Sequence, residues 1–210
     1  MRILELGARG FGTRVKELGH EVISIEWDLN GEHFEPDYYI NILETSVEDI
    51  LELTGWKPDI IWSSPHCTTY SMAGISHHRR KENGVSYPIS EYAKFSDQAN
   101  TKLIQLIKGI NPRYYFIENP RGSLRNQKFM QGLPRYTVTY CQYGDTRMKP
   151  TDIWTNHPDP QFKPACRNGD PCHERAPRGS RKGSQRLRGQ LDRAKVPQAL
   201  IEHILKISEV

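Results

Sequence analysis

Two side chains that could carry covalent chemistry each follow an apolar segment typical of a buried strand. Cys67 comes after the segment 59–62, and Glu118 comes after the segment 114–117. A cysteine thiolate is a strong nucleophile, and a nearby carboxyl group can exchange a proton with the group that the thiolate attacks. Each residue alone is more often structural, as a small buried cysteine or as part of a turn. The hypothesis of covalent catalysis therefore depends on finding them together.

The elements that must position these residues alternate between strands and helices. We expect strands over 2–6, 21–25, 38–42, 59–62 and 114–117, helices over 13–18, 47–53 and 97–108, and a hairpin from 136–143 and 151–155. This alternation predicts an α/β fold with a mostly parallel sheet and helices on both faces. Active sites of such sheets lie beyond the carboxyl ends of the strands. We expect Glu26, Cys67 and Glu118 to converge at that rim.

A glycine-rich turn between the first strand and the first helix indicates a bound nucleoside. Gly7, Gly10 and Gly12 follow Leu6 directly, and glycines there let the backbone approach a nucleotide-like ligand. Glu26 ends the second strand, where a carboxylate can accept hydrogen bonds from ribose hydroxyls. The chain lacks a complete G-x-G-x-x-G and lacks G-x-x-x-x-G-K-[ST], which argues against a dinucleotide or a triphosphate. S-adenosylmethionine fits better, and a tight turn without a ligand is the alternative.

The segment 64–71 resembles the nucleophile motif of the DNA cytosine-5 methyltransferases, which is written P-P-C-Q-x-F-S. It reads Ser-Pro-His-Cys-Thr-Thr-Tyr-Ser in this chain. Cys67 takes the place of the nucleophile, and the aromatic residue and the serine that end the motif are both present. His66 and Thr68 depart from the usual proline and glutamine.

Further segments match motifs of this family in the family's order. Glu-Trp-Asp at 26–28 resembles the acidic-aromatic pair after the second strand, and Glu-Asn-Pro at 118–120 resembles the family's Glu-Asn-Val. Asn41 and Ile42 stand where the family has an Asp-Ile pair that contacts the adenine ring. The resemblance implies a Rossmann-like, S-adenosylmethionine-dependent methyltransferase fold. It assigns the cofactor site to Leu6, Gly7, Gly10, Gly12, Glu26, Trp27, Asn41, Ile42 and Pro65.

Two weaker matches lie nearer the C-terminus. Residues 143–151 are similar to the family's Y-G-x-P-Q-x-R-x-R, but only Arg147 and Lys149 remain as cations and they are out of register. Val-Pro at 196–197 resembles the family's G-N-x-V-P without its glycine and asparagine.

The resemblance implies methyl transfer to carbon 5 of cytosine in DNA. Cys67 would add to carbon 6, which makes carbon 5 nucleophilic enough to attack the methyl group of S-adenosylmethionine. Glu118 would protonate or hydrogen-bond ring nitrogen 3, and Arg147 would hold the O2 of the base, with Lys149 as the competing candidate. Carbon 6 is out of reach inside a duplex, so the enzyme must flip the base out of the helix.

Two basic clusters are candidates for contact with DNA phosphates. The first lies in the polar segment 68–96, which is too long for a simple connection and starts beside the nucleophile, so it could fill the space of a flipped base. A solvated surface loop is the alternative. The second lies between residues 175 and 195. Together the candidates are His77, His78, Arg79, Arg80, Lys81, Arg181, Lys182, Arg186 and Arg188.

A possible zinc site lies close to the second cluster. Cys166, Cys172 and His173, with His157 upstream, could bind Zn²⁺ and stabilise a segment that is too poor in apolar residues to fold by itself. Reduced cysteines in a loop are the alternative, because the spacing is not C-x₂-C.

Length and composition indicate how the 210 residues are organised. We expect a catalytic domain over 1–156, a small basic insertion over 157–189 and a helix within 190–210 that packs back on the catalytic domain. The insertion is too short for a full target-recognition domain, which predicts weak sequence specificity and affinity from backbone charges. We expect a monomer, and a partner protein could supply specificity.

Charge, cysteine content and hydropathy narrow the class of protein. The net charge of +4 favours a polyanionic partner. Four cysteines are too few for a disulfide scaffold, so we expect a cytoplasmic protein. The compactness of the chain suits an enzyme of a bacterium or of a phage-infected host. No run reaches the roughly 20 apolar residues of a membrane span.

Two other functions remain open at this stage. One is an RNA cytosine-5 methyltransferase that acts on tRNA, since a branch of the family modifies RNA. The other is a non-catalytic module that binds S-adenosylmethionine or DNA, which the departures at His66 and Thr68 and the altered arginine motif would suit.

Overall fold

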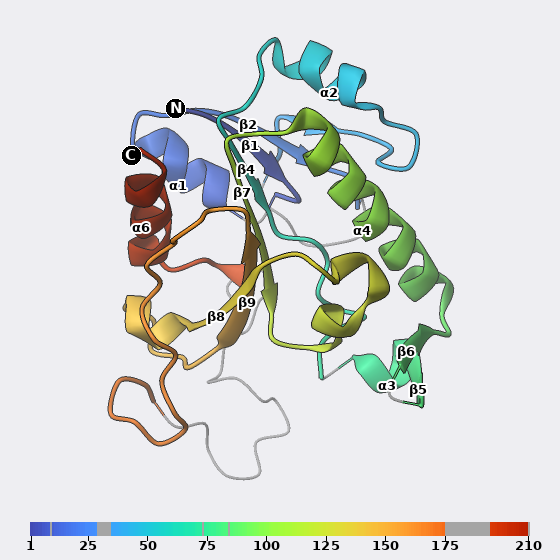
Figure 1. Cartoon of the computed structure of the whole chain (residues 1–210), viewed down its shortest axis with the longest axis vertical. Helices are drawn as coiled ribbons and strands as arrows, with labels where there is room; N and C mark the ends of the chain where they lie inside the picture. The colour runs from blue at the N-terminus through green and yellow to red at the C-terminus, as the bar shows by residue number, and fades with distance from the viewer. Residues whose placement is uncertain (9, 29–34, 73, 84, 175–193, 210) are drawn as a thin grey trace.

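A seven-stranded sheet forms the centre of the molecule (Figure 1). The computed structural model describes residues 1–8, 10–28, 35–72, 74–83, 85–174 and 194–209. The strands of this sheet, in spatial order, are β3 (Tyr38–Tyr39), β2 (Glu21–Glu26), β1 (Arg2–Leu6), β4 (Ile60–Ser63), β7 (Tyr114–Pro120), β9 (Pro150–Thr155) and β8 (Arg135–Thr139).

The sheet is parallel from β3 to β7 and antiparallel at the other edge. Strands β3, β2, β1, β4 and β7 run in one direction, whereas β9 pairs antiparallel with both β7 and β8. The expected α/β fold with a mostly parallel sheet is therefore confirmed. The expected hairpin is present as β8 and β9, but residues 140–143 form the 3₁₀ turn η3 (Tyr140–Tyr143) instead of extending the strand.

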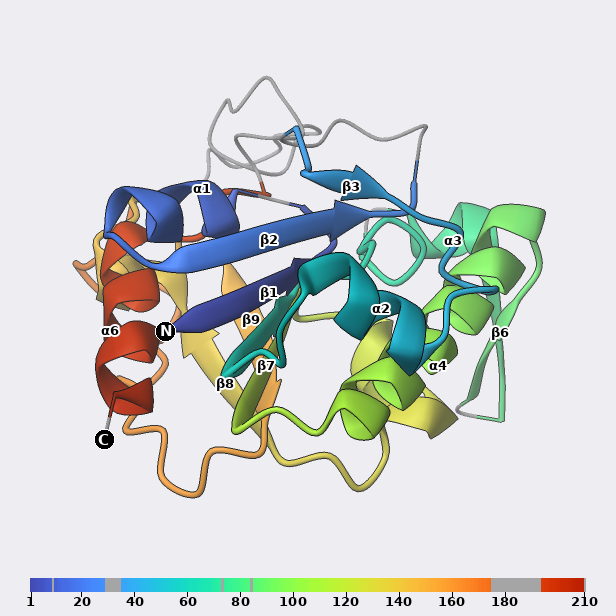
Figure 2. The same ribbon diagram turned by 90° about the horizontal axis from the view of Figure 1, so that it is seen from above.

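Helices cover both faces of the sheet (Figures 1 and 2). Helices α1 (Phe11–Glu17) and α6 (Gln198–Ser208) lie on one face, and α2 (Val47–Thr54) and α4 (Glu91–Ile110) lie on the other. Successive strand residues point to opposite faces, so Ile3 packs in the core with α1 and α6 while Leu4 packs in the core with α2 and α4. None of the described helices is both long enough and apolar enough to cross a membrane.

Local capping explains where two helices begin. The side chains of Ser46 and Asp49 each accept a hydrogen bond from the other's backbone N–H, which is a capping box at the start of α2. Ser90 accepts a hydrogen bond from Ala93 N and starts α4 at Glu91. Helix α4 is therefore longer than the expected helix over 97–108. The expected strand over 38–42 is reduced to the two residues of β3.

The polar segment after the nucleophile motif has more regular structure than the sequence suggested. It contains the short helix α3 (Ile75–His78) and the antiparallel pair β5 (Arg79–Glu82) and β6 (Val85–Pro88), which form a separate two-stranded sheet. Two 3₁₀ turns, η1 (Ser123–Asn126) and η2 (Lys128–Met130), follow β7.

Residues 157–174 lie against β8 and α6. They contain no helix or strand, yet Phe162 contacts the rings of Tyr136 and His203, and Cys166 N donates to Thr139 Oγ1 at 3.0 Å. This segment therefore joins β8 to α6.

Gly7 allows the end of β1 to approach the loop after β4. Its φ is +84°, and a Cβ atom at this position would lie 2.8 Å from the carbonyl oxygen of Ser64. Gly19 has the same φ of +84°, but a Cβ atom there would meet nothing within 4 Å. Substitutions at the two glycines therefore distinguish the free-energy cost of a left-handed backbone from that of a steric overlap.

We expect Gly7→Ala to lower the free energy of unfolding by about 3 kcal/mol, because backbone strain adds to overlap with Ser64. The matched variant Gly19→Ala should lose only about 1 kcal/mol, from strain alone. Urea unfolding followed by circular dichroism measures both. Equal losses in the two variants would contradict the close approach.

Candidate functional site

Cys67 lies beyond the carboxyl end of β4, whereas Glu118 lies near the end of the adjacent parallel strand β7, which runs to Pro120 and is longer than the expected strand over 114–117. Ser63 of β4 pairs with Ile117 of β7, so Glu118 comes one residue after this pair and Cys67 comes four residues after it. The side chain of Asn119 then donates to the carbonyl oxygen of Pro65 at 2.8 Å. Asn119 is 1% exposed, so this bond is shielded from water.

A tight turn holds residues 64–71, the candidate nucleophile segment, in place. The backbone N–H groups of Tyr70 and Ser71 both donate to the carbonyl oxygen of Cys67, at 3.0 and 2.9 Å. The carbonyl of Tyr70 accepts a hydrogen bond from Ser123 N at 2.9 Å, and a Cβ atom on Gly122 would lie 2.5 Å from that carbonyl. Glycine at 122 therefore lets the turn after β7 pack directly on the nucleophile segment.

Arg79 anchors this segment instead of facing solvent. Its side chain is fully buried, donates to the Thr69 carbonyl at 2.9 Å and pairs with Asp97, and its guanidinium lies 4.0 Å from the centre of the Tyr70 ring. The Tyr70 hydroxyl donates to the same Asp97 carboxylate at 2.6 Å. The expectation that Arg79 contacts DNA phosphates is therefore wrong for this conformation, because all of its hydrogen-bonding capacity is turned inward.

The other predicted DNA-contacting residues differ in their placement. Arg80 and Lys81 are exposed on β5, and His77 is exposed on α3. His78 is half-buried, with Nδ1 2.8 Å from Ser90 Oγ. The remaining candidates, Arg181, Lys182, Arg186 and Arg188, lie outside the described residues.

Glu118 is buried and held by a phenol. It is 4% exposed, and Tyr140 donates its hydroxyl to Glu118 Oε1 at 2.8 Å. Burial and the neighbouring Glu118 carboxylate raise the pKa of Tyr140 well above its usual range, so Tyr140 keeps its proton and acts as the donor. The sequence motifs did not point to Tyr140, which comes from η3.

Lys149 lies beside Glu118. Its Nζ is 3.9 Å from Glu118 Oε1 and 4.4 Å from the centre of the Tyr140 ring. Burial lowers the pKa of Lys149, and the negative charges of Glu118 and Cys67 oppose that shift. The largely buried ammonium group of Lys149 therefore contacts Glu118, and the charge of Cys67 acts on the same group.

Arg147 is turned toward a different neighbour. Its backbone N–H and its Nε donate to Asp145 Oδ1 at 2.8 and 2.9 Å. Burial opposes ionisation of Asp145, but the hydrogen bonds from Arg147 outweigh burial and hold the pKa of that carboxyl below its usual range. Arg147 also lines a cavity of about 540 Å³ between η3 and the start of α6. Of the two cations that the sequence left open, Lys149 is thus the one in contact with Glu118.

The end of β2 has features that suit a nucleoside. Glu26 is fully buried, and its Oε1 accepts hydrogen bonds from the backbone N–H groups of Trp27 and Asp28 at 2.8 and 3.2 Å, which fixes the carboxylate at the rim. The indole Nε1 of Trp27 is buried with no hydrogen-bond partner among the described residues. A polar ligand at this rim would satisfy such a group. Gly7 follows β1 directly, and Ile42, three residues after β3, is buried, whereas Asn41 is exposed.

His66 takes part in a buried network. Its Nε2 lies 2.9 Å from Asp28 Oδ2, and the Tyr92 hydroxyl donates to the same oxygen at 3.0 Å. The network links the nucleophile segment to the end of β2 and to α4. His66 therefore has a structural role at the rim.

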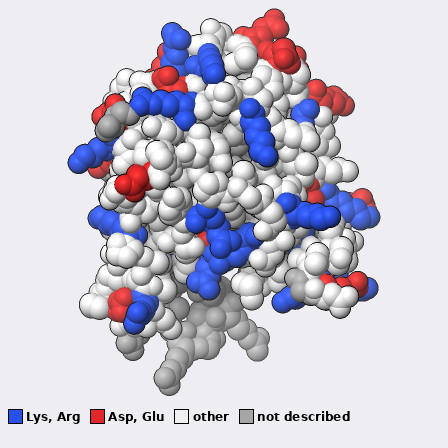
Figure 3. Space-filling model, viewed as in Figure 1, with Lys and Arg blue, Asp and Glu red and all other residues white. Residues whose placement is uncertain are grey.

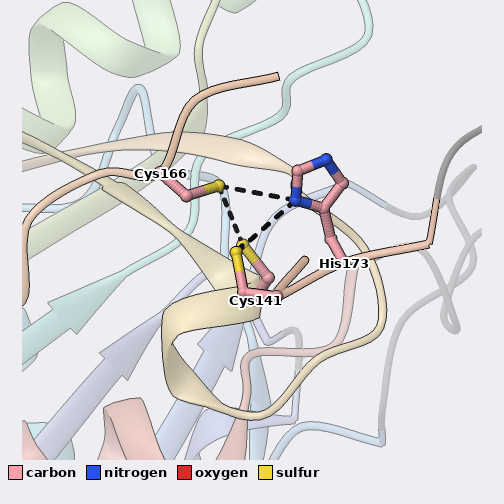
Figure 4. Close-up of side chains that lie close together, drawn as sticks. Cys141, Cys166 and His173 are labelled. Atoms are coloured by element: carbon pink, nitrogen blue, oxygen red, sulfur yellow. Dashed lines mark hydrogen bonds between the residues drawn. The ribbon is translucent and has the colours of Figure 1, made fainter. Parts of the chain in front are cut away.

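A cluster of cysteines and one histidine lies beside η3. Cys141, Cys166, Cys172 and His173 point toward one another, and their ligand atoms all lie within 4.8 Å (Figure 4). His157, expected as a member, is not one: its Nε2 is 3.1 Å from the Ile207 carbonyl and its ring contacts Tyr114. Cys141 occupies the fourth position because η3 brings it back to the 166–173 segment.

Comparison with known proteins supports the fold. No protein-family model matches the chain, and no curated protein matches it. Among solved structures, the chain is similar to a prophage-encoded protein of E. coli described as a DNA modification methyltransferase, with a TM-score of 0.51 and 14% sequence identity. The match covers 74% of this chain and 46% of that chain, so this chain spans about half the length of that protein. At this identity the match shows that the two proteins share an α/β fold.

We expect Asn119→Ala to lower the free energy of unfolding by about 1–3 kcal/mol, because the buried carbonyl of Pro65 loses its donor. The matched variant Asn156→Ala removes an amide that donates to the Arg113 carbonyl at 3.1 Å on the surface, where water replaces it, and should lose less than about 1 kcal/mol. Chemical unfolding distinguishes the two. A smaller loss for Asn119→Ala than for Asn156→Ala would show that the strand ends are joined in another way.

Proposed function

We propose that this chain is an S-adenosylmethionine-dependent methyltransferase that modifies carbon 5 of cytosine in DNA. The observation that carries the proposal is the hydrogen bond from Asn119 to the Pro65 carbonyl, which joins the residue after Glu118 to the loop that carries Cys67, with the ammonium group of Lys149 3.9 Å from Glu118 Oε1. A nucleophile, a carboxyl group and a fixed positive charge at one site are the groups that addition to a pyrimidine ring requires.

The cofactor site would lie at the carboxyl ends of β1 and β2. Glu26 would accept hydrogen bonds from the ribose hydroxyls, and Trp27 and Ile42 would contact the adenine ring. When bound, S-adenosylmethionine supplies an electrophilic methyl group on a sulfonium. The residues of this rim fit such a ligand, since a buried carboxylate, a buried indole N–H and a glycine turn meet there.

Cys67 would act as the nucleophile. Its thiolate adds to carbon 6 of the flipped base, and the electron pair of the 5,6 double bond becomes available at carbon 5. Lys149 favours the thiolate because a nearby cation stabilises the negative form of a thiol. After the transfer, a base removes the proton from carbon 5, the double bond forms again and the thiolate leaves.

Glu118 would offset the negative charge that develops on the ring by donating its carboxyl proton to ring nitrogen 3. Glu118 has two described partners, Tyr140 and Lys149, and both contact its Oε1 atom. Oε2 is therefore the oxygen that can reach ring nitrogen 3. Tyr140 and Lys149 hold the carboxyl group in a fixed orientation, which is how preorganised dipoles and charges lower a barrier. Arg147 would then line the approach to the site without touching the base.

DNA is the substrate that the surface and the structural comparison favour. Lys and Arg side chains gather near the middle of one face, while Asp and Glu lie mainly at its edges (Figure 3). Arg80 and Lys81 are exposed on the hairpin whose Arg79 is anchored to the nucleophile segment. The structural neighbour is described as a DNA modification methyltransferase. With few residues for a recognition domain, most of the affinity would come from phosphate contacts.

A covalent trap tests the reaction and its substrate together. Duplex DNA that contains 5-fluorocytosine should form an adduct with the wild-type chain in the presence of S-adenosylmethionine, because fluorine cannot leave as a proton does and Cys67 stays bound. The adduct is measured as a shifted band on a denaturing gel. It should be absent for Cys67→Ser and absent without the cofactor.

Matched tRNA that contains 5-fluorocytosine distinguishes the two nucleic acids. An adduct with the RNA alone would replace DNA as the substrate. If neither nucleic acid is trapped by wild type, the chain is a binding module and not an enzyme of this class.

We expect Lys149→Gln to slow single-turnover methyl transfer by about 100-fold or more, as happens when one preorganised charge-stabilising group is removed. The matched variant Arg147→Gln should lose less than about 10-fold, since its guanidinium is paired with Asp145. Incorporation of radioactive methyl groups into DNA measures both rates. The opposite order would assign the role at the base to Arg147.

A further inference from the structure

Four potential metal ligands from two separate segments meet beside η3. Cys141 Sγ lies 3.1 Å from Cys166 Sγ and 3.6 Å from Cys172 Sγ. Nδ1 of His173 lies 3.7 Å from Cys166 Sγ and 3.6 Å from Cys172 Sγ. Figure 4 shows Cys141, Cys166 and His173 directed toward a common point.

These separations match the edges of a tetrahedral zinc site. With Zn–S near 2.3 Å and Zn–N near 2.0–2.1 Å, ligand atoms lie about 3.6–3.8 Å apart. The distances that involve His173 and Cys172 already have this length, and the Cys141–Cys166 pair would open by roughly 0.7 Å. A disulfide would need about 2.05 Å between the sulfurs, and all four cysteines are free thiols.

We propose that Cys141, Cys166, Cys172 and His173 bind one Zn²⁺ ion as a structural Cys₃His site. Four protein ligands leave no open position for water or substrate, which is characteristic of structural zinc and not of catalytic zinc. On binding, the three thiols release their protons to solvent and the neutral imidazole coordinates through Nδ1, so no oxidant or reductant is needed.

The surroundings of the cluster suit thiolate ligands. Gln142 Nε2 lies 3.6 Å from Cys172 Sγ as a donor, and Cys166 is held by the hydrogen bond from its backbone N–H to Thr139. Lys163 donates to the Gln142 carbonyl at 3.0 Å and adds a positive charge near a site whose net charge would be −1. Such outer contacts orient the ligands of metal sites.

A bound metal would stabilise the chain around the cluster. Residues 157–174 contain no helix or strand, so little besides side-chain contacts holds them in place. The metal would join them to η3, which carries Tyr140 next to Cys141. Glu174 N also donates to the Thr146 carbonyl at 2.9 Å, and Tyr140 N donates to the Met148 carbonyl at 3.0 Å. Zinc would therefore brace the turn on which both Tyr140 and the approach to Lys149 depend.

Metal content of the full-length protein tests the site. After purification or refolding in the presence of zinc and removal of unbound metal, elemental analysis should find one zinc per chain. Replacement with Co²⁺ should give the visible absorption bands of tetrahedral cobalt and a sulfur-to-cobalt charge-transfer band. Removal of the metal with a chelator should lower the melting temperature.

Two histidines of the same region provide the matched variants. His173→Ala should weaken zinc binding by at least about 100-fold, and Cys141→Ser should do the same. His157→Ala should keep one zinc per chain, because His157 contacts Ile207 and Tyr114 instead.

Three results would overturn the proposal. One is wild-type protein that holds well under one zinc per chain. Another is a Cys141–Cys166 disulfide, found by mass spectrometry of the unreduced protein. The third is loss of zinc in His157→Ala together with full zinc in Cys141→Ser. The cobalt spectrum of wild type keeps the test decisive even if a cysteine variant does not fold.

Discussion

The hydrogen bond from the Asn119 side chain to the Pro65 carbonyl joins strand β7 to the loop after β4, and the candidate site depends on this connection. Parallel pairing of β4 and β7 brings their ends to one rim, but Cys67 lies four residues beyond the last paired residue of β4. The sheet alone therefore cannot fix the position of the sulfur. A buried amide that binds a buried carbonyl is costly to separate, and this bond connects the residue after Glu118 to the loop that carries Cys67.

A second set of contacts fixes the other side of the same loop. Tyr70 is buried between Arg79 and Gly122, and both Tyr70 and Arg79 bind Asp97 of α4. The arginine thereby ties β5 to the nucleophile segment. The basic cluster therefore has two parts. Arg79 is buried and sets the position of the hairpin, whereas Arg80 and Lys81 are exposed.

The charges at the rim form one coupled group. Glu118, Tyr140 and Lys149 are all largely buried, and each satisfies the others with a hydrogen bond, an ion pair or a cation–π contact. Buried charges persist only when they are paired, so loss of one member would leave the others unsatisfied. Because Tyr140 and Lys149 both come from the chain between β8 and β9, the geometry of Glu118 depends on the C-terminal part of the chain, where the cysteine cluster lies.

Some of this protein could be determined from the sequence by itself. Apolar segments separated by helical periodicity predicted the parallel sheet, and the positions of Cys67 and Glu118 just after two such segments predicted that they share a rim. Hydrophobic periodicity and the ends of apolar segments are local patterns, so the sequence itself contains them.

The tertiary structure decided the rest. Arg79 turned inward because Asp97, 18 residues away, offers a buried carboxylate. Lys149 rather than Arg147 reached Glu118 because Asp145 holds Arg147. Cys141, and not the expected His157, belongs to the cluster because η3 folds back on residues 166–173. Each of these outcomes depends on partners that come together only when separate segments pack, and spacing along the chain carries no record of such partners.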